Sequence, residues 1–306
     1  MEGKTREMNT QTNSSFLELQ PKLKDLNLSN SFLFGEVMWD EETSKDVLEI
    51  ILQKEIRKVV IVNKEQHLDS DIDHKGIRLD IYIKDDENTV YNIEMQVENR
   101  YNIAKRSRHY QAVIDTKLLP AGEIDYNKLN NTYIIFICLF DLFGKDKFCY
   151  TFEERCAEDL SLKLEDGTKK IFLNTKGKNT NEVPAELIEF LKLIENTNIN
   201  QSKLRCEKLK RLHQRVKTVK NNKEVEARYM TMLLHDKEIA MEAREEGREE
   251  GREEGRNELV QNMLLENMNI SFIVKISKLP EETVREIKDK LIKEGKLKES
   301  NHNCKE

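Results

Sequence analysis

The chain has 306 residues, of which 38% are hydrophobic and 35% are charged, and its formal net charge is -6. Its longest apolar run, residues 133–140, is far shorter than the roughly 20 residues that cross a bilayer, and no apolar block follows the basic start of the chain. We therefore exclude a membrane-spanning or secreted protein and expect a cytoplasmic one. The five cysteines form no Cys-x-x-Cys pair, which argues for reduced thiols and against structural zinc.

Hydrophobic periodicity divides the first two thirds of the chain into an arm and a domain. Residues 1–28 are rich in Asn, Thr, Ser and Lys and predict a mobile N-terminal arm. Residues 29–198 predict a compact α/β domain, because two helical pieces between residues 32 and 56 precede short β-branched or aromatic runs. We expect strands at residues 59–62, 77–83, 90–97, 133–140, 148–152 and 170–173, and helices at residues 103–119 and 183–194.

Only helical signals follow residue 198. Residues 199–258 comprise a basic helix between Lys203 and Lys223 and then a Glu/Arg/Gly repeat that indicates a solvated spacer. The polar face of the basic helix either contacts DNA phosphates, with Arg211 and Arg215 as candidates, or only solubilises the helix. Residues 259–306 predict a small helical hairpin, a pattern that helix-turn-helix motifs share with other helical hairpins. The charge stripes of the repeat are compatible with a homo-oligomer but specify no partner.

The strongest chemical signal lies in the predicted hairpin between residues 77 and 97. A turn centred on Glu87 places Asp80 directly opposite Glu94 on one face of the sheet. Like charges at this spacing destabilise a sheet, so the pair requires a proton, an intervening basic side chain or a hard cation such as Mg²⁺. A salt bridge from Arg78 to one of the acids is the alternative without catalysis.

The helix predicted after this hairpin begins with cations. Lys105, Arg106 and Arg108 are unfavourable for the helix dipole near its N-terminus, and contact with phosphate would explain them. Arg106 and Tyr110 are four residues apart and therefore share a helical face. We expect Lys105, Arg106 and Tyr110 to bind the DNA backbone, whereas Arg108 is solvated.

Three segments, in this order along the chain, resemble the core of the PD-(D/E)XK nuclease family transposases, the Rpn group of recombination-promoting nucleases. They read Arg-Leu-Asp-Ile-Tyr at residues 78–82, Tyr-Asn-Ile-Glu-Met-Gln at residues 91–96 and Arg-Ser-Arg-His-Tyr-Gln at residues 106–111. Residues 31–35, 133–138 and 170–177 and the Glu/Arg tail are also similar to that group. The resemblance spans about residues 28–260.

The resemblance implies a restriction-endonuclease-like α/β core of helix, three-stranded antiparallel meander, helix and strand, with an all-α C-terminal extension. It also implies a DNA endonuclease that depends on Mg²⁺ or Mn²⁺ and is associated with recombination or mobile elements. In this family Asp80 and Glu94, with the backbone carbonyl of Met95, would bind the catalytic metal. The fold usually draws a third carboxylate from its first helix, for which Glu49 is the first candidate and Glu36 the second.

Gln96 stands where the superfamily name leads one to expect Lys. A neutral amide orients a water molecule by hydrogen bonding, but it carries no charge to stabilise a developing anion. A catalytically weak nuclease fold that binds DNA or protein is therefore the alternative to an active enzyme. A third reading, a helical interaction protein with an α/β scaffold, requires the basic helix to pair with acids elsewhere in the chain.

Overall fold

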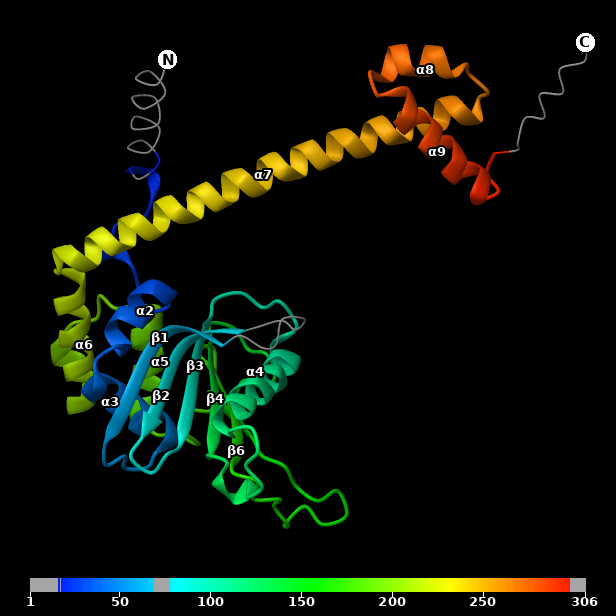
Figure 1. Cartoon of the computed structure of the whole chain (residues 1–306). Helices are drawn as coiled ribbons and strands as arrows, with labels where there is room; N and C mark the ends of the chain where they lie inside the picture. The colour runs from blue at the N-terminus through cyan, green and yellow to red at the C-terminus, as the bar shows by residue number, and fades with distance from the viewer. Residues whose placement is uncertain (1–15, 17, 69–76, 298–306) are drawn as a thin grey trace, which may run out of the picture. The chain divides into compact units, whose positions relative to one another are not determined.

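The computed structural model describes residue 16 and residues 18–68 and 77–297 (Figure 1). The chain divides into two compact units, with the boundary after Thr231. The helices and strands of the first unit, up to the start of α7, are η1 (Leu23–Asp25), α2 (Ser31–Met38), α3 (Glu41–Leu52), β1 (Val59–Leu68), β2 (Ile77–Asp85), β3 (Val90–Gln96), α4 (Ile103–Leu118), η2 (Tyr126–Lys128), β4 (Thr132–Cys138), β5 (Cys149–Phe152), β6 (Thr168–Asn174), α5 (Ala185–Glu195), η3 (Gln201–Lys203) and α6 (Glu207–Lys220).

A mixed six-stranded sheet with the order β1-β2-β3-β4-β6-β5 forms the centre of the first unit. Strands β1, β2 and β3 form an antiparallel meander, β4 and β6 continue it in parallel, and β5 pairs antiparallel with β6. The run Ile134–Cys138 of β4 is buried throughout, as expected for a central strand that is covered on both faces. The predicted mixed α/β class is confirmed, and the order of helix, meander, helix and strand is present.

Helices cover both faces of this sheet (Figure 1). Helix α4 packs on β4 and covers one face, which we call the α4 face. Helices α2 and α3 pack on β1 and cover the other, the α2 face, while α6 packs on α2, α3 and α5. Helix α3 starts at Glu41 because the side chain of Asp40 accepts a hydrogen bond from the Thr43 amide at 2.9 Å.

The packing of the first unit extends beyond both predicted boundaries of the domain. Leu23, Leu26 and Leu28 are buried, so the chain joins the core before the predicted end of the arm at residue 28. Helix α6 belongs to the first unit, although the domain was expected to end at residue 198. The reason is its apolar stripe, which is buried in the packing with α2, α3 and α5 and consists of Leu209, Leu212, Val216 and Val219.

The second unit is helical. Helix α7 (Lys223–Leu265) starts in the first unit and contains the Glu/Arg/Gly repeat, and α8 (Ile270–Ser277) and α9 (Glu281–Lys293) follow it. A small core holds the end of α7 to α8 and α9, and its buried members are Val260, Leu264, Ile273, Val284 and Leu291. The predicted pair of short helices is thus present. Over the part of the chain that the structure describes, no helix is long and apolar enough to cross a membrane.

Candidate active site

The hairpin of β2 and β3 has the predicted register. Ile81 pairs with Ile93 and Tyr82 with Asn92, a register centred on Glu87 that places Asp80 opposite Glu94. The two acidic residues are linked directly, because the Asp80 amide donates to Glu94 Oε1 at 3.1 Å. The Met95 amide in turn donates to Asp80 Oδ2 at 2.9 Å. The hairpin therefore brings both carboxylates and the Met95 peptide together.

Glu94 and Gln96 lie on the α4 face. In the parallel ladder Glu94 pairs with Phe136 and Gln96 with Cys138, and partners in a ladder share a face of the sheet. Phe136 and Cys138 belong to the buried cluster that also contains Tyr110 of α4. The first turns of α4 consequently meet the acidic end of the hairpin.

Glu94 is a buried carboxylate, with 2% of its surface exposed. Asn92 Nδ2 donates to Glu94 Oε1 at 3.1 Å, and Arg106 Nη2 donates to Glu94 Oε2 at 3.2 Å. Burial raises the pKa of Glu94 well above its ordinary value, and the nearby Asp80 carboxylate adds to the increase. These hydrogen bonds and the Arg106 charge oppose the increase without cancelling it. Without a metal, Glu94 therefore takes up a proton more readily than an ordinary carboxylate, and a bound cation would take the place of that proton.

Arg106 is the basic side chain that lies against this carboxylate. Its Nη1 donates to Gln96 Oε1 at 3.1 Å, so Arg106 links Gln96 to Glu94, and Gln96 stays partly exposed. The guanidinium carbon lies 5.2 Å from the ring centroid of Tyr110 and 5.4 Å from that of Phe136. The sequence leaves open three ways to compensate the two carboxylates: a proton, an intervening basic side chain or a cation. The structure contains an intervening basic side chain, Arg106 of α4.

The residues of α4 that were predicted to contact DNA differ in their exposure. Lys105 is exposed, as a backbone contact requires, and Arg108 is exposed, as expected for a solvated side chain. Tyr110 is buried in the core cluster and forms the wall behind Arg106. Arg106 is partly exposed but pairs with Glu94, so Arg106 and Tyr110 do not form the shared DNA-binding face that was expected.

The donor atoms at the hairpin suit a hard divalent cation. Mg²⁺ takes oxygen ligands and usually uses one or two carboxylates, with water and substrate phosphate completing its octahedron. Asp80, Glu94 and the Met95 carbonyl offer such a set. Among the described residues, no group of three His, Cys, Asp or Glu side chains is arranged to hold a metal without other ligands. The residues fit a metal that shares its coordination with water and substrate.

Glu49 does not join the pair, in contrast to the prediction. It accepts hydrogen bonds from the Ile56 amide at 2.9 Å and pairs with Lys208 of α6 at 2.9 Å. Burial alone would raise the pKa of Glu49, but these hydrogen bonds outweigh burial and lower it. Glu36 is bound in the same way, by Lys64 and Arg228. Both acids sit on helices that cover the α2 face, opposite Glu94.

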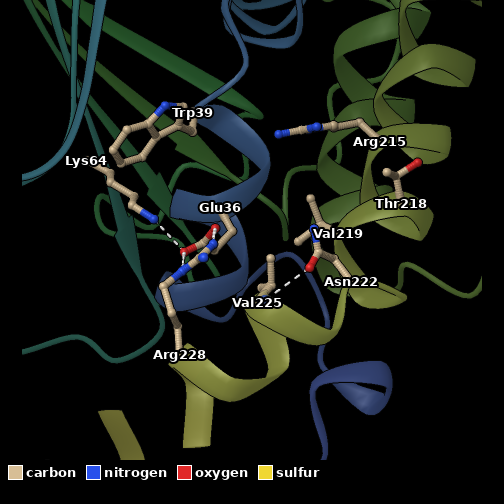
Figure 2. Close-up of a pocket in the computed structure, with 9 residues that line it drawn as sticks. All are labelled: Glu36, Trp39, Lys64, Arg215, Thr218, Val219, Asn222, Val225 and Arg228. Atoms are coloured by element: carbon tan, nitrogen blue, oxygen red, sulfur yellow. Dashed lines mark hydrogen bonds and ion pairs between the residues drawn. The ribbon is translucent and has the colours of Figure 1, made fainter. Parts of the chain in front are cut away.

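Arg211 and Arg215, the two candidate DNA contacts on α6, have different surroundings. Arg211 Nε and Nη2 donate to the two oxygens of the buried Asp46 carboxylate at 2.8 and 2.7 Å, so Arg211 fastens α6 to α3. Its predicted DNA contact is therefore not supported. Arg215 points into a pocket on the α2 face (Figure 2).

Sequence reasoning missed Asn92 and the pairing of Arg106 with Glu94. The alternation of β3 carried a signal for Asn92, since residues two apart on a strand share a face and Asn92 therefore lies beside Glu94. No sequence signal identified Arg106 as the partner of Glu94. That contact depends on how α4 lies across the sheet.

A family model described as PD-(D/E)XK nuclease family transposase matches residues 30–244 of the chain. The matched range contains the whole sheet, the carboxylate pair and α4. The comparisons with curated proteins and with solved structures give no match.

Proposed function

Because the chain belongs to the PD-(D/E)XK nuclease family transposases, we propose that it is a metal-dependent DNA endonuclease that hydrolyses phosphodiester bonds. The observation that supports this most directly is the convergence of Asp80 and Glu94 beside Gln96 and Arg106. Mg²⁺ is the proposed metal, with Mn²⁺ as a substitute. The association with recombination or mobile elements that the Rpn resemblance implies is part of the same proposal.

Asp80, Glu94 and the Met95 carbonyl are the proposed metal ligands. When bound, the divalent cation lowers the pKa of a coordinated water and neutralises charge on the scissile phosphate. The hydrogen bond from the Met95 amide restrains one Asp80 oxygen, and Asn92 and Arg106 restrain both oxygens of Glu94. The carboxylates are thus held in place before any ligand arrives, which reduces the cost of assembling the site.

Gln96 and Arg106 act together in place of the superfamily Lys. The Gln96 carbonyl oxygen accepts a hydrogen bond from Arg106, which leaves the Gln96 amide NH₂ as the donor that can orient a water or a phosphate oxygen. Arg106 supplies the positive charge that an amide lacks, next to the position where the transition state becomes more negative. Arg106 is therefore a positioning residue for Gln96 and Glu94.

Substrate contact in this proposal falls to the exposed start of α4. Lys105 and Arg108 are both exposed there, and each can neutralise a backbone phosphate. Helix α6 contributes less than its composition suggests, because Lys208 and Arg211 pair with Glu49 and Asp46. An interaction protein built on the helices would also require this pairing of α6 with acidic residues. The link from Gln96 to Glu94 through Arg106 favours an enzyme over a catalytically weak binding module.

Plasmid cleavage at low salt tests the proposal, with Mg²⁺, with Mn²⁺ and with a chelator. Asp80→Ala and Glu94→Ala should each lower the cleavage rate by about 10³-fold or more, since loss of a metal ligand removes several kcal/mol of transition-state stabilisation. Glu98→Ala is the matched control, because Glu98 is an exposed acid just beyond β3. An inactive wild type with both metals, or full activity in Asp80→Ala, would exclude the proposed site.

A further inference from the structure

A pocket lies on the α2 face, on the other side of the sheet from Glu94. It has a volume of about 480 Å³ and is formed by α2, β1, α6 and the first two turns of α7 (Figure 2). Its charged lining residues are Glu36, Lys64, Arg215 and Arg228. Lys64 pairs with Ile81 in the β1–β2 ladder and so shares its face, whereas the neighbouring Asp80 points to the opposite face. The pocket is therefore separate from the candidate active site.

The charges in this pocket do not balance. Arg228 Nη2 lies 2.7 Å from Glu36 Oε2, and Lys64 pairs with Glu36 Oε1, so one acid serves two cations. Burial alone would raise the pKa of Glu36, but the hydrogen bonds from Arg228 and Lys64 lower it, which keeps the carboxylate ionised. With Arg215 added, three cations face one anion, and the pocket favours an anionic ligand.

Arg215 supplies the uncompensated charge. Its side chain extends from α6 into the pocket toward α2 (Figure 2). Its Nε is buried and has no hydrogen-bond partner, and no carboxylate in the described part of the chain pairs with the guanidinium. A guanidinium without a paired carboxylate carries a charge that an anionic ligand in the pocket would neutralise. A guanidinium matches the geometry of a phosphate in particular.

Two further features define the size and chemistry of the ligand. Trp39 is 53% exposed and forms an aromatic wall of the pocket, with Lys64 Nζ 4.4 Å from its ring centroid. Asn222, which also lines the pocket, caps α7 by accepting hydrogen bonds from the Glu224 and Val225 amides. The volume is that of a site for a small molecule rather than a flat contact surface.

We propose that this pocket binds a phosphorylated small molecule of nucleotide size. The phosphate lies against Arg215, and the planar ring lies against Trp39. This role is additional to the proposed nuclease activity and does not depend on it, because none of the residues involved belongs to the carboxylate pair.

Trp39 is the single tryptophan of the chain, so its fluorescence reports on this pocket alone. We would titrate the full-length protein without divalent metal with ATP, with inorganic phosphate and with a short DNA duplex. A saturable change with ATP is expected, and Arg215→Gln should weaken the apparent affinity by about tenfold or more, as for loss of a charged hydrogen bond. Arg215 has no described partner, so this variant should keep the fold, which circular dichroism checks.

The control is Arg205→Gln, which removes an 87% exposed guanidinium from the segment just before α6 and should bind ATP like the wild type. The Asp80→Ala variant should also bind ATP normally, so failure of the nuclease proposal and failure of this one are distinguishable. No saturable change with ATP, or equal affinities for Arg215→Gln and Arg205→Gln, would overturn the proposal. Inorganic phosphate binding as tightly as ATP would refute the ring contact, and a response to DNA alone would reassign the pocket to nucleic acid.

Discussion

Removing Arg106 should destabilise the metal-free protein. Arg106→Met leaves the buried Glu94 beside Asp80 without its cation, while a flexible side chain still covers Tyr110 and Phe136. Removing one partner of a buried ion pair costs about 3–5 kcal/mol, and the 26% exposure of the Arg106 side chain lowers the expected loss. We expect the free energy of unfolding to fall by about 2–4 kcal/mol.

Urea denaturation at about pH 9, with a chelator present, measures this loss, because Glu94, whose pKa is raised to about 8, is ionised there. The double variant Arg106→Met, Glu94→Gln should recover at least half of it, because a neutral amide no longer needs the cation, and the coupling energy between the two sites should be about 1–3 kcal/mol. Arg100→Met, at an exposed position before α4, should change stability by less than about 0.5 kcal/mol. A loss in Arg106→Met as small as that of the control, or no recovery in the double variant, would refute the charge-compensation argument.

Three further predictions concern the charged residues Glu36, Arg211 and Lys105. Glu36→Gln should lower stability at neutral pH by about 1–2 kcal/mol, since half-exposed Arg228 contributes less than a buried partner would. Folding lowers the pKa of Glu36 from 4.5, so the difference in unfolding free energy between Glu36→Gln and wild type should persist above pH 4.5 and shrink as the pH falls below it. Urea titrations at several pH values measure this difference. A difference that does not change with pH would contradict the assignment. Arg211→Ala should lower stability by about 1–2 kcal/mol and leave DNA affinity unchanged, because Arg211 binds Asp46. Lys105→Ala should leave stability unchanged, weaken DNA binding and reduce the salt dependence of that binding by about one phosphate. Fluorescence anisotropy at several salt concentrations measures this dependence. Equal effects of Arg211→Ala and Lys105→Ala on DNA affinity would contradict the prediction.

The sequence by itself determined the secondary structure of the core and the register of the hairpin. Alternating residues between Ile77 and Gln96 define two strands, and a short turn centred on Glu87 leaves little freedom in how they pair. For that reason Asp80 and Glu94 could be placed opposite each other without a structure. The contacts involved are local, and the length of the turn decides them.

Only the tertiary structure decided which distant charges meet. Arg106 binds Glu94 because α4 crosses the α4 face at its first turns, and Arg211 binds Asp46 because the apolar stripe of α6 lies against α3. Before folding, a lysine or arginine on an amphipathic helix has the same pattern whether it will face solvent, DNA or a buried acid. Packing between elements far apart in the chain makes that choice, and it is also what left Arg215 in a pocket with no acid of its own.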